Sequence, residues 1–74
     1  MTLHEAMVAV LRDKTREATP SEIAAWITDR NLFRRTDGMV AGGSQVSARA
    51  HKYPRLFYKN ETKGDVWELR EWLG

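Results

Sequence analysis

The stretch GSQVSARAHKYPRLFY, residues 43–58, decides the fold class. A short polar and basic segment with helical spacing runs into Pro54, and an aromatic segment typical of a β-strand follows it. Because proline pushes the preceding residue out of helical geometry, we expect the helix to end near Tyr53. Ser44 is expected to cap its N-terminus. The order predicts a short helix followed by a strand.

The two faces of this helix differ in character. Val46, Ala50 and Tyr53 fall on one apolar stripe. The remaining positions, which face outward or lie at the boundary, are Gln45, Ser47, Ala48, Arg49, His51 and Lys52. No acidic residue occurs between Gly38 and Asn60, whereas a helix exposed only for solubility usually pairs Glu with Lys. The outer face therefore favours an anionic partner.

A β-hairpin is expected downstream of this helix. Its strands are predicted at Leu56–Lys59 and Asp65–Leu69, joined by a polar turn at residues 60–64. The residues expected on its buried face are Phe57, Trp67 and Leu69. Trp72 and Leu73 either pack against the first helix or begin a linker, and the sequence leaves both readings open.

Two capping boxes predict two helices upstream. Thr2 precedes Glu5 by three residues, and Thr19 precedes Glu22 in the same way, with Pro20 at the first helical position. The apolar residues that recur at helical spacing are Leu3, Ala6, Met7, Val10 and Leu11 in the first helix and Ile23, Ala24, Trp26 and Ile27 in the second. Residues 13–18 are predicted to form a loop. Asn31 suits the left-handed residue that ends a helix.

The region between the second and third predicted helices is rich in turn residues. Leu32 and Phe33 are expected to return to the core, with a short strand at Leu32–Arg34. The predicted elements follow the order of a winged helix-turn-helix, which is helix, helix, short strand, helix and hairpin. This is an α+β fold. We therefore expect residues 1–74 to form a single winged-helix DNA-binding domain, the N-terminal module of a larger protein.

Composition restricts the chemistry that the chain can support. A domain of 74 residues buries only about 60% of its unfolded surface, which leaves little room for a catalytic cleft beside a core. The chain has no cysteine, so it has no disulfide, no thiolate zinc ligand and no cysteine nucleophile. No apolar run approaches the roughly 20 residues of a membrane span. We expect a cytoplasmic, nucleoid-associated protein with no membrane partner.

Positive charge is concentrated in the middle of the chain. The net charge is only +2, but residues 31–63 hold seven Lys and Arg against two Asp and Glu, a balance of +5. Such a local excess is the electrostatic footprint expected of a nucleic-acid-binding surface. A solvated face that happens to be basic is the alternative.

Three phrases of the sequence resemble the HARE-HTH family of winged helices. They are TPSEI at residues 19–23, NLFRR at residues 31–35, and SQVSAR at residues 44–49 with YPRLF at residues 53–57. The family's domains are attached to bacterial restriction endonucleases, to other DNA-modifying proteins and to eukaryotic chromatin proteins, and these phrases are most similar to the nuclease-linked branch. The resemblance implies binding to double-stranded DNA, with a linked nuclease or other effector domain and a link to base methylation. Many members have a Thr-Pro pair at the start of the third helix, where Gly42-Gly43-Ser44 stands here.

The candidate DNA-binding residues follow from the expected helix and wing. A helix fits the major groove, where its first residues meet base edges and basic groups nearby hold phosphates. The groove candidates are Ser44, Gln45, Ser47 and Arg49. The backbone candidates are Lys52, Arg55, Lys59 and Lys63, together with Arg34 and Arg35 in the connector. Gln45 can pair with adenine and Arg49 with guanine. For each residue, solvation or an internal ion pair is the competing explanation.

Catalysis has little support in the sequence. His4 and His51 lie on separate predicted helices, and no group of carboxylates and histidines has metal-ligand spacing. Residues 61–63 match the Glu-x-Lys of restriction nucleases, but they fall in a predicted turn. The aromatic residues, which can stack on an extruded base, are more simply explained as core. We therefore predict no enzyme activity, no metal and no cofactor. A protein-docking winged helix with an acidic partner remains the alternative function.

Overall fold

The computed structural model describes residues 1–14, 17–34, 38 and 41–70, without the side chains of Lys14 and Lys63. Its elements, in chain order, are α1 (Leu3–Lys14), β1 (Glu17–Ala18), α2 (Pro20–Asp29), α3 (Gly43–Lys52), β2 (Phe57–Asn60), the 3₁₀ turn η1 (Glu61–Lys63) and β3 (Val66–Leu69). Three helices and a three-stranded antiparallel sheet form an α+β fold compatible with a winged helix. The predicted fold class is confirmed.

Both capping boxes form as predicted. The backbone N–H of Thr2 donates to Glu5 over 2.7 Å, and that of Glu5 donates to the Thr2 hydroxyl over 3.3 Å. At α2, the reciprocal bonds between Thr19 and Glu22 are 3.0 and 3.2 Å long. These bonds satisfy amide groups that a helix N-terminus otherwise leaves without partners.

The end of α2 also forms as the sequence predicted. Asn31 has φ 53°, a left-handed conformation that asparagine tolerates better than most residues. Its N–H donates to the carbonyl of Thr28, and the N–H of Leu32 donates to that of Ile27. This pair of bonds is a Schellman motif, which satisfies the last carbonyls of the helix and turns the chain away.

The sheet corrects the predicted order of elements. The short strand lies at Glu17–Ala18, inside the segment predicted to be a loop, and Leu32–Arg34 is not a strand. Glu17 and Ala18 pair with Glu68 and Trp67, so β3 lies between β1 and β2. A two-residue strand has no period to detect, and it forms only because the edge of β3 is there to accept it. Leu32 and Phe33 pack against the core from outside the sheet.

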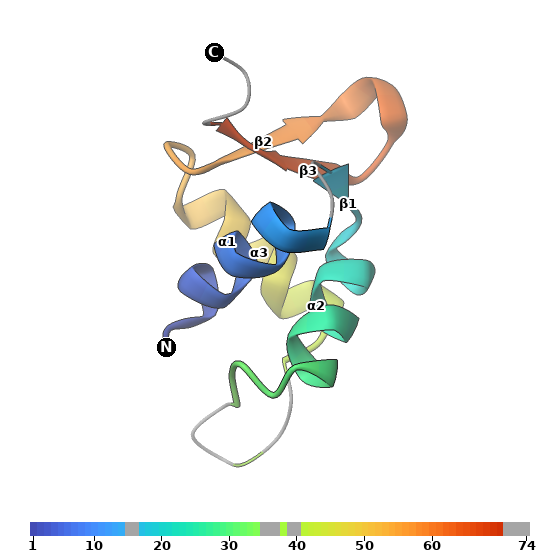
Figure 1. Ribbon diagram of the computed structural model, residues 1–74. Coiled ribbons are helices and arrows are strands. Elements are labelled where there is room, and N and C mark those ends of the chain that lie inside the picture. Colours follow the sequence, from blue (N-terminus) through green and yellow to red (C-terminus); the bar gives the residue numbers. More distant parts are fainter. Residues whose placement is uncertain (15–16, 35–37, 39–40, 71–74) are drawn as a thin grey trace.

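The hairpin is close to the prediction. Phe57 pairs with Leu69 and Lys59 with Trp67, which places alternate residues of β2 and β3 on the face toward the helices. Phe57, Trp67 and Leu69 are buried there as expected. Figure 1 shows the sheet on one side of the three helices and the turn of the hairpin extending past them.

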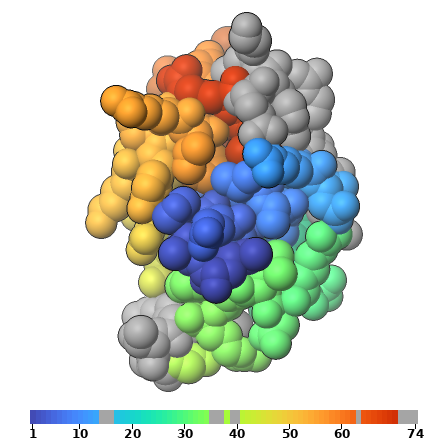
Figure 2. Space-filling view, turned by 60° about the vertical axis from the view of Figure 1, so that its left-hand side comes forward, coloured from blue at the N-terminus to red at the C-terminus, as the bar shows by residue number. Residues whose placement is uncertain are grey.

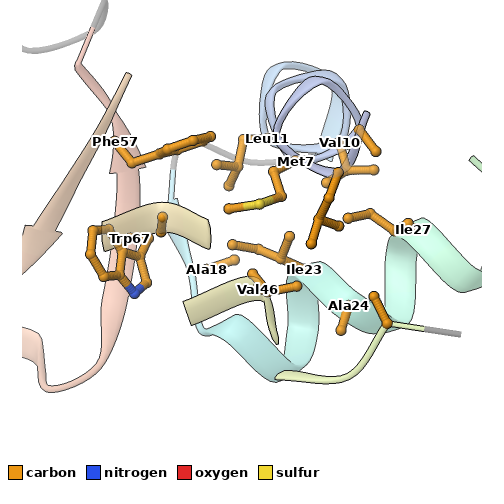
Figure 3. Packing of buried hydrophobic residues seen from close by; sticks show 14 of the residues in the cluster. Met7, Val10, Leu11, Ala18, Ile23, Ala24, Ile27, Val46, Phe57 and Trp67 are labelled. Carbon is orange, nitrogen blue, oxygen red and sulfur yellow. The ribbon is translucent and has the colours of Figure 1, made fainter. Parts of the chain in front are cut away.

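The helices and the sheet close one core. Its largest fully buried side chains are Phe57, Met7, Leu11, Ile23, Ile27, Leu69, Val10 and Val46. Figure 3 shows α1, α2, α3 and the sheet each contributing side chains to this cluster. Trp26 and Tyr53 pack against it only half-buried. Trp72 lies outside the described residues, so its predicted packing stays open.

One local expectation about a side chain was wrong. Helix α3 begins at Gly43 with Gly42 as its N-cap, so Ser44 lies inside the first turn and does not cap it. A contact that the sequence did not predict is the stacking of the half-buried His4 ring on Tyr53, with centroids 4.1 Å apart. The contact joins the start of α1 to the end of α3, residues too far apart in sequence for any local pattern to pair them.

Candidate nucleic-acid interface

Helix α3 is fixed to the body of the molecule along one face. Val46 and Ala50 are fully buried, and α3 packs against both α2 and α1. At its start, Gly43 lies against the backbone and hydroxyl of Ser21. After its end, a turn at residues 54–56 leads directly into β2. The opposite face of the helix is consequently turned to solvent, as the apolar stripe predicted.

Five polar side chains on that outer face are unpaired within the described chain, whereas His51 is hydrogen-bonded to the Ser47 carbonyl. Ser44 and Lys52 are exposed, whereas Gln45, Ser47 and Arg49 are half-buried. In the part of the chain that the structure describes, none of these five side chains takes part in a hydrogen bond or ion pair. The internal salt bridge that was the competing explanation for Arg49 is therefore not found there. The unpaired groups are available to a ligand.

The N-terminus of α3 adds partial positive charge to the same face. Gly42 has no side chain to cap the helix, and the first turn holds no acidic residue. The first N–H groups of a helix lack intrahelical acceptors and attract anions. Arg49, His51 and Lys52 lie in the last turn, where cations offset the helix dipole. Both ends of the face are therefore suited to negative charge.

The remaining candidate cations fall into different environments. Arg34 donates from Nε to Asn31 over 3.3 Å and from one terminal nitrogen to the carbonyl of Gly38, so its side chain is held by its own connector. Lys59 forms an ion pair with Asp65 across the hairpin, with Nζ and Oδ1 3.6 Å apart. Arg35 and the side chain of Lys63 lie outside what the structure describes.

Arg55 lies in the turn that joins α3 to β2. It is exposed and lines a hollow of about 280 Å³. The other residues of this hollow are Val8, Arg12, Leu56, Leu69 and Arg70. The structure therefore groups Arg55 with the end of α1 and with the sheet. The continuous surface that runs from α3 into β2 is seen in Figure 2 as the yellow to orange side of the molecule, beside α1.

A groove between the end of α3 and the hairpin was not expected from the sequence. It has a volume of about 500 Å³ and is open to solvent. Its residues are Ala50, His51, Pro54, Phe57, Tyr58, Lys59, Glu61, Thr62, Trp67 and Arg70. The only sequence signal for it was the aromatic content of residues 53–58 and 67, which the core explained equally well.

The aromatic side chains of this groove contact each other and a cation. The His51 ring meets Trp67 edge-on with centroids 5.0 Å apart, and its Nδ1 donates to the carbonyl of Ser47 over 2.8 Å. The guanidinium of Arg70 lies 5.5 Å from the centre of the exposed Tyr58 ring. Its Nε also donates to the carbonyl of Pro54. These contacts fix the ring positions around the groove.

One buried donor in this region has no acceptor. The indole Nε1 of Trp67 is the only buried side-chain nitrogen or oxygen without a partner among the described residues. Figure 3 shows this nitrogen on the side of the ring away from Phe57. A buried donor without an acceptor costs about 1–3 kcal/mol. Such a group is unusual in a folded protein and marks the groove as a candidate ligand site.

The described residues give no sign of a metal centre. Over residues 1–14, 17–34, 38 and 41–70, no three His, Asp or Glu side chains gather as a metal site requires. Glu61, Thr62 and Lys63 form the 3₁₀ turn of the hairpin. None of the described helices has the length and apolar character needed to cross a bilayer. The absence of enzyme activity stays a prediction.

Comparison with protein-family models, characterised proteins and solved structures found no match for this chain. Its function is therefore inferred from the site.

Proposed function

We propose that this chain is a double-stranded DNA-binding module that places α3 in the major groove and the hairpin against the phosphate backbone. The observation that carries the proposal is the outer face of α3, which lies in a stretch without an acidic residue between Gly38 and Asn60. Five of its polar side chains are unpaired within the described chain: those of Ser44, Gln45, Ser47, Arg49 and Lys52. An α-helix fits the major groove of B-DNA, and the anionic backbone supplies most of the binding energy of such modules.

The positions of the side chains support separate roles. Ser44 and Gln45 lie in the first turn of α3, the part of a recognition helix that meets base edges. Arg49 follows one turn later with an unpaired guanidinium, suited to guanine, and Gln45 is suited to adenine. Lys52 at the end of the helix is suited to a phosphate. Lys59 is available to the backbone only after it leaves Asp65.

We also propose a role for this module within a larger protein. The resemblance to nuclease-linked HARE-HTH domains supports a targeting role for a covalently linked restriction or modification-dependent enzyme, with methylated DNA as one form of the target. Cytoplasmic, nucleoid-associated location follows from the same reading. Affinity panels with unmethylated and methylated duplexes test this finer claim directly.

The central experiment compares two charge-matched double variants. Arg49→Ala with Lys52→Ala removes two unpaired cations from α3, and we expect duplex affinity to fall at least tenfold, because each contact contributes on the order of 1–3 kcal/mol. Arg12→Ala with Arg30→Ala removes the same charge from α1 and the end of α2, where Arg30 pairs with Asp13, and is expected to change affinity by less than threefold. Circular dichroism checks that both variants fold. Equal losses in the two variants would show that net charge, not the α3 face, attracts DNA.

Salt titration separates DNA binding from docking of an acidic protein. If α3 and the hairpin neutralise several phosphates, the logarithm of the association constant should fall with the logarithm of salt by about 0.9 per phosphate contacted. A protein-docking module would show no duplex binding even at low salt. That outcome would contradict the proposed function and favour an acidic protein as the partner of the α3 face.

A further inference from the structure

The groove between α3 and the hairpin differs from the α3 face in its chemistry. The α3 face presents unpaired polar groups, whereas the polar groups around the groove are largely engaged. Lys59 pairs with Asp65, the Thr62 hydroxyl donates to Asn60 over 2.6 Å, and Arg70 donates to the carbonyl of Pro54. The groove therefore offers a ligand the exposed rings of His51 and Tyr58, beside the carboxylate of Glu61. A bare phosphate would find few open donors there.

Among the described residues, the hydrogen-bonding groups of the groove without a partner are the exposed carboxylate of Glu61 and groups on three aromatic rings, of which the Trp67 nitrogen is buried. The Nδ1 of His51 is committed to the carbonyl of Ser47, which leaves Nε2 as the acceptor of the neutral ring. The Tyr58 side chain is 37% exposed, and its hydroxyl has no partner in the described chain. The Trp67 indole N–H has none either. A ligand matching this set is flat and carries donors and acceptors on its edge.

We propose that the groove receives a single unpaired nucleobase from the DNA that α3 binds, an inference that rests on the proposed function. Its volume of about 500 Å³ lies in the range of pockets that enclose small organic molecules. A nucleobase combines flat faces, which stack on aromatic rings, with an edge of donors and acceptors. Because the groove begins at the last turn of α3, the strand held by that helix is the source of the base.

The state of the DNA follows from the geometry of a duplex. A paired base is stacked inside the helix and cannot reach a groove on a protein surface, so only a base that is extruded, bulged or mismatched can enter. The module should then bind a duplex with one unpaired base next to the α3 contact more tightly than the intact duplex. Base stacking on aromatic side chains supports a preference of at least fivefold.

The test uses two duplexes of identical sequence. One is intact, and the other carries a single bulged 2-aminopurine, whose fluorescence falls when it stacks on aromatic rings. We expect the bulged duplex to bind at least fivefold more tightly, with quenching. Tyr58→Ala and His51→Ala should each reduce the preference toward unity. Tyr58→Phe, which keeps the ring, should retain it. Lys52→Ala should weaken both duplexes by the same factor.

The NMR signal of the Trp67 indole N–H separates the possible failures. Equal affinities for the two duplexes, with an indole signal that neither duplex moves, would overturn the groove inference and leave duplex binding by α3 intact. An indole signal shifted by adenosine monophosphate, in a protein that binds neither duplex, would overturn the proposed function and retain the groove as a nucleotide site. A preference for the bulged duplex that survives both alanine variants also contradicts the groove assignment.

Discussion

The start of α3 lies so close to the start of α2 that a β-carbon on Gly43 would be 3.0 Å from the hydroxyl oxygen of Ser21. The same carbon would lie 3.3 Å from the Cα and N of Ser21. These contacts are shorter than side chains normally accept, so glycine at this position allows the two helices to approach. The position of α3, and of every group on its outer face, depends on that approach.

Gly43→Ala should therefore move α3 away from α2. Alanine favours helix by up to about 1 kcal/mol, but overpacking costs roughly 1–3 kcal/mol, so we expect a net loss of stability of about 1 kcal/mol. Urea denaturation measures it. In a Ser21→Ala background the shortest contact is absent, and the loss should shrink. A stabilised single variant would show that the two helices separate without cost.

Asn31 tests the end of α2 in a similar way. Its φ of 53° costs most L-residues about 1–2 kcal/mol, so Asn31→Ala should destabilise the domain by about 1 kcal/mol. Asn31→Gly should be neutral or slightly stabilising, because glycine adopts this conformation freely. Thermal denaturation of the pair checks the expectation. The same loss in both variants would point instead to the bond that Asn31 accepts from Arg34.

The register of β2 predicts opposite outcomes for two neighbours. Phe57 is fully buried, and Phe57→Ala should cost about 3–5 kcal/mol, enough to unfold much of a small domain. Leu56 is 37% exposed, and Leu56→Ala should cost less than about 1 kcal/mol. Circular dichroism with denaturant measures both. A slip of the strand by one residue would reverse the ranking.

Glu5 should make the stability of the domain depend on pH. Its hydrogen bonds with the Thr2 backbone and hydroxyl lower the pKa of the Glu5 carboxyl below its ordinary value of 4.5. A carboxyl with a depressed pKa in the folded state stabilises the fold above its unfolded pKa, and this contribution disappears as pH falls through the folded pKa. Glu5→Gln should therefore be less stable at neutral pH, with a smaller difference at low pH. Parallel stability curves would contradict this.

Asp65 forms an ion pair with Lys59, the hairpin cation that the proposed DNA contact would use. Asp65→Asn removes the partner of Lys59 and one negative charge from the hairpin, so duplex affinity should rise about two- to fivefold at low salt, with a steeper salt dependence. Asp29→Asn, an equal change at the exposed end of α2, serves as the control. Unchanged affinity in Asp65→Asn would place the hairpin away from the DNA backbone.

Local interactions explain why much of the fold was predictable. Capping boxes join residues three apart, and the stripe from Leu3 to Leu11 depends only on helical spacing. The left-handed Asn31 and the stop at Pro54 are single-residue properties. The strand β1 was missed because Glu17 and Ala18 become a strand only by pairing with residues about fifty positions later.

The candidate site, like the fold, could be predicted only in part. The acid-free outer face of α3 could be predicted from the sequence, because helical spacing alone places Gln45 and Lys52 opposite the stripe of Val46 and Ala50. The sequence does not show whether each cation has an ion-pair or hydrogen-bond partner. Lys59 and Arg34 have the same sequence signature as Lys52, and only the folded chain brings Asp65 and Gly38 to them.

By itself, then, the sequence determined the helices, the hairpin, the buried faces and the sign of the α3 surface, all of which depend on residues within a few positions of each other. The tertiary structure decided the pairing of β1, the close approach of Gly43 to Ser21, the engaged or unpaired state of each cation, and the aromatic groove with its unpartnered Trp67 N–H. The β1 pairing, the approach of Gly43 to Ser21 and the groove join distant parts of the chain. The contacts of Lys59 and Arg34 join residues only four to six positions apart, but they too form only once the folded backbone places those groups together.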